Sequence, residues 1–351
     1  MKKRFALLLL LSLSLVSNAV FAKDHFKVAW SIYVGWMPWD YAANAGIVKK
    51  WGKKYGIDID VVQINDYVES INQYTAGKFD GCAMTNMDAL TIPAASNVDS
   101  TALIVGDFSN GNDGIVLKGK GKKTLKDIKG QRVNLVEFSV SHYLLARALG
   151  SVGMSEKDVK TVNTSDADIV GAYKSPSVTA VVTWNPLLNT ILKMPDSHEV
   201  FNSSQIPGEI IDLMVVNTKT LKQNPKFGKA LTGAWYEILK RMQGESAKAK
   251  KIRTAMAKDS GTDLKGFDKQ LKTTAMFYKP ADAVKFTDSP KLKTTMKYVA
   301  EFSFKHGLLG TGAPNSKFIG IQTPSGVYGD PNNIKLRFDP SYMKMAADGK
   351  L

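Results

Sequence analysis

The strongest constraint on the fold is a regular alternation of short apolar runs with amphipathic runs of helix length. Between residues 26 and 107 the pattern predicts strands at Phe26–Trp30, Ile57–Ile64, Asp80–Thr85 and Ser100–Asp107, and helices at Ala42–Lys54, Val68–Gly77 and Met87–Ser96. Strands that alternate with helices of this length form βαβ units with parallel strands. The sequence therefore predicts an α/β protein with mainly parallel sheets flanked by helices.

A turn-rich break, SNGNDG at Ser109–Gly114, interrupts this pattern, and a second α/β pattern follows it. The run Ile210–Val216 then reads as a strand that returns to the first lobe, and from Gly310 the chain is rich in Gly, Pro and Asn. We therefore expect two lobes that face each other across a cleft. The predicted division is 23–110 for the first part of lobe 1, 111–212 for lobe 2, and 213–351 for the return to lobe 1 with C-terminal helices and a wrapping tail.

Residues 1–22 have a basic start, an apolar core and a small-residue end, which is the pattern of a secretory signal peptide cut after Ala22. The single cysteine, Cys82, cannot form an intramolecular disulfide. No later segment has the roughly 18 consecutive apolar residues of a membrane helix. We therefore expect a periplasmic protein, a monomer, stabilised by its hydrophobic core. The net charge of +15 would suit nucleic acid, but the export signal argues against that partner.

Positive charge is missing from the loops that would face the cleft. In open α/β sheets, ligands bind beyond the carboxyl ends of the strands. Six loops of this kind contain no Lys or Arg, although the chain has 47; they are Ser31–Tyr41, Ile64–Ser70, Met84–Thr91, Glu137–Tyr143, Thr183–Asn189 and Ser203–Asp212. The same loops carry seven carboxylates and several Trp and Tyr side chains. Carboxylates attract a cation and an indole face adds about 0.5–2 kcal/mol, so the cleft should bind cations and repel anions.

The candidate ligand-binding residues come from these loops. We expect direct contacts from Trp39, Asp40, Glu137, Trp184 and Asp212, and further contributions from Trp36, Asp66, Asn86, Asp88 and Ser139. Structural roles remain open for some of them. Asp66, Asp88 and Ser139 stand where helices begin and could cap them, and the first loop could form an aromatic plug. Asp212 begins an apolar strand, where a charge needs a partner.

Several segments resemble the periplasmic substrate-binding proteins of ABC importers, in the branch related to taurine, alkanesulfonate and pyrimidine-precursor binders. They are YVGWMPWDYAANAGIVKKWGKKYGIDIDVV, AGKFDGCAMTNMDAL, EFSVSHYLLARALGSVG, VVTWNPLLN and IPGEIIDLMVVN, in that order between Tyr33 and Asn217. VVTWNP and IPGEIIDLMVVN look like the sub-branch found beside urea-carboxylase-type genes, with guanidine or urea-like substrates. The resemblance implies a type II fold of two lobes that close on a ligand, no catalysis, and delivery to an inner-membrane permease driven by a separate ATPase.

The hypothesis from these observations is a solute-binding protein for guanidinium, or for a small amidine, urea or amine, with no cofactor and no metal. The missing basic residues at the strand ends distinguish the chain from the sulfonate binders that it resembles. Four alternatives stay open: a neutral urea or amide ligand, a sulfonate, an enzyme of the pyrimidine-synthase-like branch, and a sensory binding subunit.

Overall fold

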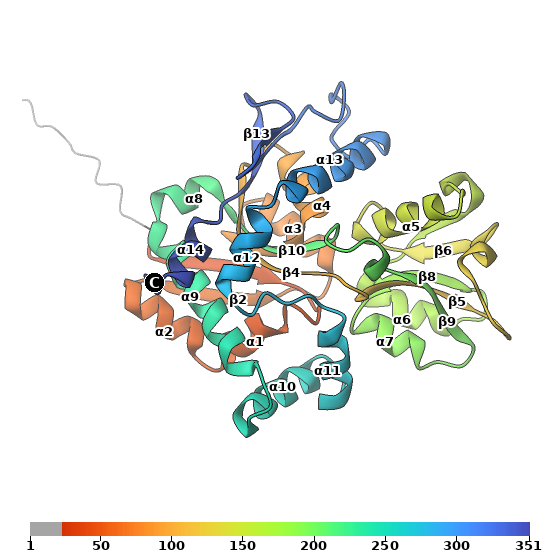
Figure 1. Cartoon of the computed structure of the whole chain (residues 1–351), viewed down its shortest axis with the longest axis horizontal. Helices are drawn as coiled ribbons and strands as arrows, with labels where there is room; N and C mark the ends of the chain where they lie inside the picture. Colours follow the sequence, from red (N-terminus) through yellow and green to blue (C-terminus); the bar gives the residue numbers. More distant parts are fainter. Residues whose placement is uncertain (1–22) are drawn as a thin grey trace, which may run out of the picture.

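The computed structural model describes residues 23–351, so the predicted signal peptide lies outside the described residues. Two β-sheets, each flanked by helices, form two lobes placed side by side (Figure 1). Both the α/β class and the two-lobe architecture predicted from the sequence are confirmed. No helix within residues 23–351 combines the length and the apolarity needed to cross a membrane.

The sheet of lobe 1 has eight strands, and the strands at its centre are almost entirely buried. Its order is β12-β11-β13-β4-β10-β3-β1-β2. The strands are β1 His25–Trp30, β2 Asp58–Gln63, β3 Gly81–Thr85, β4 Ser100–Phe108, β10 Ile211–Asn217, β11 Gly320–Thr323, β12 Gly326–Tyr328 and β13 Ile334–Phe338. Because β3 and β4 are covered on both faces, their sequences are continuous small or apolar runs. Strands β1, β2 and β3 are parallel, whereas β10 runs antiparallel to β3 and β4.

The sheet of lobe 2 has five strands in the order β7-β6-β8-β5-β9. The strands are β5 Asp113–Lys118, β6 Arg132–Leu135, β7 Lys160–Asn163, β8 Ala180–Trp184 and β9 Ser197–Asn202. The pairs β6–β7 and β6–β8 are parallel, and β5 is antiparallel to β8 and β9. Both sheets are therefore mixed: the strands nearest the two crossings between lobes, β5 and β10, run against the parallel βαβ units.

Helices cover both sheets, and the first of them departs from the prediction. The helix predicted at Ala42–Lys54 is two helices, because Gly46 has a φ of +72° and ends one helix before the next begins. The α-helices are α1 Met37–Asn44, α2 Ile47–Tyr55, α3 Tyr67–Thr75, α4 Asn86–Ala89, α5 Val140–Ser151, α6 Asp166–Lys174, α7 Leu187–Leu192, α8 Thr218–Gln223, α9 Pro225–Met242, α10 Ala247–Asp259, α11 Leu264–Lys272, α12 Pro280–Thr287, α13 Pro290–Lys305 and α14 Ser341–Ala347. A π-helix η1 Leu90–Ala94 and the 3₁₀ helices η2 Leu125–Ile128, η3 Glu156–Asp158 and η4 Ser203–Gln205 complete the set.

The C-terminal segment is more than the wrapping tail expected from its Gly, Pro and Asn content. It adds β11, β12 and β13 to the sheet of lobe 1, with β13 parallel to β4. Ile321 and Leu336 are fully buried there. Turn residues such as Gly326 and Gly329, both at positive φ, separate strands that are too short to stand out in the sequence.

Two crossing segments join the lobes, one from β4 to β5 and one from β9 to β10. They are bonded to each other through Ser109 and Ser203, whose hydroxyl oxygens lie 2.6 Å apart, and the Gly111 amide donates to the Ser203 hydroxyl at 2.8 Å. A third segment lies alongside, since Thr274 pairs with Ser109 and the Asn110 amide donates to the Thr273 carbonyl at 2.9 Å. The exact lobe boundaries in residue numbers stay a prediction.

Candidate functional site

A small cavity lies between the lobes at the strand ends. Its walls are aromatic, aliphatic and acidic, and are formed by Tyr33, Trp36, Tyr67, Thr85, Asp113, Val140, Trp184, Ile210 and Asp212. Lobe 1 supplies residues from the loop after β1, from α3, from β3 and from the start of β10 with the residue before it. Lobe 2 supplies residues from β5, α5 and β8. The cavity volume is about 10 Å³, which is about the room that one water-sized sphere needs for its centre. The lobes are therefore closed onto one another in this structure.

Aromatic rings make one side of the cavity. The ring centroid of Tyr67 lies 5.7 Å from that of Trp36 and 5.6 Å from that of Trp184. Trp184 belongs to lobe 2, and its indole Nε1 donates to the Ile32 carbonyl of lobe 1 at 3.3 Å. Beside it, the Val34 amide donates to the Asn185 carbonyl at 3.3 Å. The same loop after β1 thus supplies ring surface to the cavity and backbone contacts that hold the lobes together.

The buried carboxyl groups of Asp113 and Asp212 make the other side, and that of Asp107 lies beside Asp212 without lining the cavity. Asp107 and Asp212 are directly opposite each other in the pairing of β4 with β10, so their side chains are on the same face of the sheet. Asp113 follows the crossing, and all three are at least 97% buried. The Tyr33 hydroxyl donates to Asp107 Oδ1 at 3.0 Å, and a methyl group at Gly35 would lie 2.7 Å from Asp107 Oδ2. The glycine therefore lets the loop after β1 pass close to this carboxyl.

A fourth carboxyl, that of Asp88, lies behind the cavity wall. Its Oδ2 accepts from the Tyr67 hydroxyl at 2.6 Å and from the Thr85 hydroxyl at 2.8 Å. Both donors line the cavity. Asp88 Oδ1, Asp107 Oδ2 and Asp212 Oδ2 are buried and have no hydrogen-bond partner among the described residues.

No Lys or Arg of residues 23–351 lines the cavity or forms an ion pair with these four carboxyls. Burial therefore raises the pKa of Asp113 to about 7 and that of Asp88 to about 6, although hydroxyl groups lower both. Burial raises the pKa of Asp107 to about 7. For Asp212, burial and the negative charge of Asp107 both raise the pKa well above its usual range. Charges of one sign gathered in a dry site are unfavourable until an opposite charge enters.

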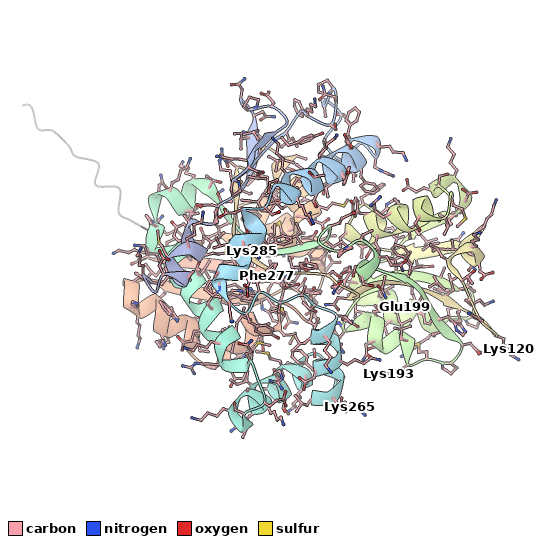
Figure 2. All side chains as sticks on the ribbon, in the orientation of Figure 1. Lys120, Lys193, Glu199, Lys265, Phe277 and Lys285 are labelled. Carbon is pink, nitrogen blue, oxygen red and sulfur yellow. The ribbon has the colours of Figure 1, made fainter. Side chains whose placement is uncertain are left out.

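The structure brings some of the predicted residues to the cavity. Trp36, Trp184 and Asp212 line it, and Asp88 lies directly behind it. Three exposed lysines illustrate where basic residues lie outside the cavity: Lys120 stands at the far end of lobe 2, whereas Lys193 and Lys265 line a separate open groove between α7 and α11 (Figure 2). The predicted segregation of positive charge from the cleft is therefore present at the cavity.

The structure places the other predicted residues away from the cavity. Trp39 stacks on Trp235 in the core of lobe 1, with ring centroids 4.9 Å apart. Asp40 is half-buried and accepts a hydrogen bond from Asn44 at 3.1 Å, one helical turn along α1. The reason is the early start of α1 at Met37, which turns both residues onto a helix that faces α9 and solvent rather than the cleft.

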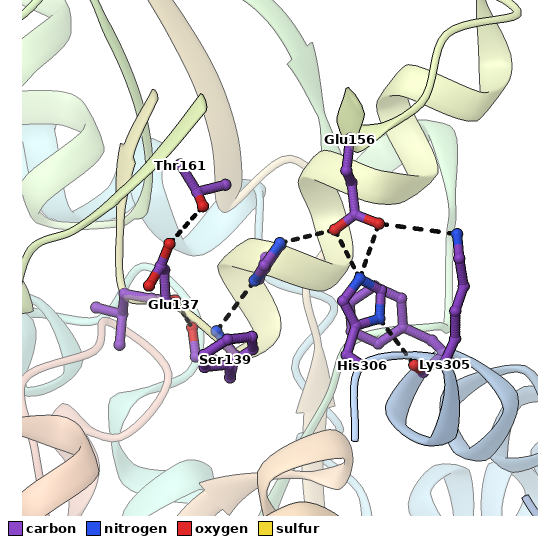
Figure 3. A network of polar contacts seen from close by, with 10 residues as sticks. Glu137, Ser139, Glu156, Thr161, Lys305 and His306 are labelled. Atoms are coloured by element: carbon purple, nitrogen blue, oxygen red, sulfur yellow. Dashed lines mark hydrogen bonds and ion pairs between the residues drawn. The ribbon is translucent and has the colours of Figure 1, made fainter. Parts of the chain in front are cut away.

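Asp66, Asn86, Glu137 and Ser139 have structural partners. Asp66 caps α3 through the Glu69 amide at 2.8 Å, and Ser139 caps α5 through the Ser141 amide at 3.2 Å. Asn86 holds the crossing segment, since its Oδ1 accepts from the Ile211 amide and its Nδ2 donates to the Glu209 carbonyl. Glu137 accepts from the Thr161 hydroxyl of the neighbouring strand β7 (Figure 3). Together with Asp66 it lines a separate surface groove.

The sequence reasoning missed Asp107 and Asp113, because the segment between them was interpreted only as a turn at the lobe crossing. A signal was present: an aspartate ends the otherwise apolar strand STALIVGDF, and another opens the next strand. Tyr33 and Tyr67 were among the aromatic residues of the loops, but they were not chosen as site residues.

Two lobes joined by crossing segments, with a cavity between them at the strand ends, are the architecture of the periplasmic binding protein class of folds. The alkanesulfonate-binding protein of Xanthomonas axonopodis pv. citri, solved with MOPS, superposes with a TM-score of 0.66 at 16% identity, covering 82% of this chain and 95% of that one. The chain belongs to the NMT1/THI5-like family, whose model matches residues 41–243.

Curated relatives agree with this assignment. A Brucella abortus (strain 2308) protein provisionally named as a binding protein is 26% identical over 263 residues, which is 74% of this chain and 77% of the relative. The taurine-binding periplasmic protein of Escherichia coli (strain K12) is 24% identical over 145 residues, 40% of this chain and 44% of the relative.

Proposed function

We propose that this protein is the solute-binding component of an ABC importer and that it captures a small nitrogen-rich cation, guanidinium or a close relative, between its lobes. The observation that supports this proposal best is the set of buried, unpaired carboxyls beside an aromatic wall. A planar cation with several N–H groups can donate to Asp113 and Asp212 at its edge while Tyr67, Trp36 or Trp184 covers its face. Such contacts strengthen one another where water is excluded.

The size of the cavity supports a ligand of few atoms. Because the closed lobes leave about 10 Å³ between the nine lining residues, a ligand enters only when the lobes separate. The lobes would then close around the ligand, because the ligand binds the closed state more tightly than the open state. The names of the E. coli and Xanthomonas relatives support the transport role, in which the binding protein works in the periplasm and delivers its ligand to a membrane permease.

A sulfonate is the main rival, because both of these relatives bind one according to their names. A sulfonate would bring its negative charge next to Asp113 and Asp212, and no described Lys or Arg lines the cavity to balance it. A neutral urea fits the size, but it leaves the carboxyl charges unbalanced and would bind best when these groups are protonated. An enzyme of the pyrimidine-synthase-like branch is a further candidate, which conversion of the bound ligand would reveal.

Isothermal titration calorimetry with guanidinium, urea and taurine at pH 8 tests the proposal. We expect guanidinium to bind and taurine to give no heat. The variant Asp113→Asn should weaken guanidinium binding by about 100-fold or more, because a buried charge pair loses one partner. Asp40→Asn is the matched control and should bind as the wild type does, since Asp40 lies on α1 outside the cavity. Tight taurine binding without guanidinium binding would overturn the proposal.

Growth separates transport from sensing. A strain that lacks the protein should grow poorly when guanidinium at limiting concentration is the nitrogen source, and it should recover with the wild-type protein. Normal growth together with a lost transcriptional or behavioural response would favour a sensory subunit.

A further inference from the structure

A second interlobe contact lies outside the cavity, where the end of α13 meets lobe 2. Glu156 of η3 accepts from His142 of α5 at 2.7 Å and lies 2.7 and 2.8 Å from Nε2 of His306, the residue that ends α13 (Figure 3). His142 and Glu156 belong to lobe 2, whereas α13 packs on α4 and β12 of lobe 1. Glu156 therefore holds one histidine from each lobe.

The hydrogen-bond partners decide which protons the two rings carry. His142 Nδ1 accepts from the Phe138 amide at 3.1 Å, so its proton is on Nε2, and a neutral ring satisfies both contacts. His306 is different. Its Nδ1 faces the Phe302 carbonyl at 2.9 Å and its Nε2 faces the Glu156 carboxylate, and both of these partners only accept. Both contacts are hydrogen bonds only when both nitrogens of His306 carry a proton, that is, when the ring is an imidazolium.

Glu156 is the negative partner of this imidazolium. Partial burial acts to raise its pKa, but the hydrogen bonds from His142 and His306 outweigh burial and lower the pKa to about 2. Glu156 is therefore ionised over the whole pH range in which a histidine titrates. Lys305 adds a weaker positive charge from α13, with Nζ 3.8 Å from Glu156 Oε2 on a side chain that is 73% exposed. Further along α5, Arg147 is already paired with Glu209 at 2.8 Å.

A metal ion could in principle occupy the same three side chains, because their ligand atoms lie within 4.8 Å of one another. The Phe138 amide argues against it. A neutral histidine that binds a metal through Nε2 carries its proton on Nδ1 and donates it to an acceptor. Nδ1 of His142 faces an N–H donor instead, so metal binding would place two donors against each other. For His306, the Phe302 carbonyl would be a suitable acceptor for a proton on Nδ1 while Nε2 binds a metal. However, one histidine and one carboxylate do not make a closed metal site.

We propose that His142, Glu156 and His306 form an interlobe clasp that closes the ligand-free protein more strongly when His306 is protonated. A ring that loses its second proton can no longer donate to both the Phe302 carbonyl and Glu156, so the clasp weakens as the pH rises. The bond from His142 and the charge of Lys305 remain at high pH, so the clasp loosens without vanishing. This inference concerns lobe closure and does not depend on the identity of the ligand.

The experiment measures the distance between the lobes in the ligand-free protein. Spin labels are attached at Lys160→Cys in lobe 2 and Lys317→Cys in lobe 1, both exposed positions. Cys82 should not react, because it is fully buried and burial raises its thiol pKa to about 12. Pulsed electron spin resonance then gives the closed fraction at pH 5.5, 6.5, 7.5 and 8.5.

The decisive quantity is the difference between wild type and His306→Gln. The buried carboxyls of the cavity also favour closure at low pH, and this effect is common to both proteins. Between pH 5.5 and 8.5, the ratio of closed to open protein should fall more in the wild type than in His306→Gln. The expected difference is about three- to tenfold, which is the effect of losing one partly exposed, charge-assisted hydrogen bond. His306→Arg should stay closed at high pH. His25→Gln is the control, because His25 and Asp60 form a 3.0 Å pair within lobe 1.

Identical pH profiles for wild type and His306→Gln would overturn the proposal. A closed fraction that rises with added Zn²⁺ and falls with EDTA would also overturn it, in favour of a metal site. A pH dependence in His306→Arg as steep as that of the wild type, and not reduced to that of His306→Gln, would likewise contradict the clasp.

Discussion

Asp107 and Asp212 are aligned across β4 and β10, a position where two like charges repel each other in any sheet. The fold accepts them because the Tyr33 hydroxyl supports one oxygen and because a proton can be shared between the two carboxyls. Raising the pKa of Asp107 to about 7 disfavours its charged form by on the order of 4 kcal/mol, so an ionised Asp107 lowers the stability of the ligand-free protein. Residues that cost stability in this way mark functional sites.

Stability should depend on pH in the direction that these raised pKa values set. The native state holds protons on Asp107 and Asp113 that the unfolded chain releases at a pH of about 4. Their stabilising contribution is therefore complete below pH 4 and is lost as the pH rises to about 7, the pKa of both groups in the fold. The variant Asp107→Asn should be more stable than wild type at pH 8, by on the order of 2 kcal/mol, and no more stable at pH 4.

Thermal unfolding of the ligand-free proteins at both pH values measures this effect. Asp60→Asn serves as the control, because Asp60 is an exposed residue of β2. A lower melting temperature for Asp107→Asn at pH 8 would contradict the account of the buried carboxyls.

Particular residues show how far sequence reasoning reaches. Trp184 and Asp212 line the cavity because one ends an apolar strand and the other begins one, and strand limits are set by local pattern; their contact with a ligand stays a prediction. Trp39 and Asp40 lie outside the cavity wall, because α1 starts three residues upstream of Asp40, and that start depends on Pro38 and on packing against α9. The pairing of Asp107 with Asp212 joins residues 105 positions apart, and no local pattern contains that information.

At the scale of elements, the crossing segments are the part of the molecule that must bend. Ser203 is their main connection, because its hydroxyl lies between Ser109 and the Gly111 amide and is completely buried. It begins η4, directly after β9, so both crossings are tied near the point where the sheets end. A hinge that is cross-linked by hydrogen bonds moves as one unit rather than as independent loops.

The variant Ser203→Ala should loosen this hinge. Loss of the hydroxyl leaves the buried Gly111 amide without an acceptor, which costs about 1–3 kcal/mol. Hydrogen exchange of the amides of residues 109–113 should become faster, while exchange in β1 and β3 should not change. Ser204→Ala is the control, since Ser204 is exposed and bonds only Asn202. Unchanged exchange in the crossings would show that the hydroxyl pair does not hold them.

At the scale of the whole molecule, the proposed ligand and the proton compete for the same carboxyls. A cation gains most from the cavity when Asp113 and Asp212 are ionised, yet burial raises the pKa of Asp113 to about 7 and that of Asp212 well above its usual range. Binding should therefore release protons, and guanidinium affinity should rise from pH 5 to pH 8 and then level off. The clasp at His306 has the opposite pH dependence, because it favours the closed protein at low pH.

Calorimetry in buffers of different ionisation enthalpy measures the protons released at pH 6.5, and the expected value is between about 0.5 and 2 per ligand, since up to two carboxyls that line the cavity change state. The variant Asp113→Asn should release fewer protons even where binding is still measurable. His306→Gln should release more than wild type, because ligand-induced closure no longer takes up a proton at the clasp. If binding instead consumed protons in all three proteins, the carboxyls would not be the partners of the ligand, and a neutral or anionic ligand would account better for the cavity.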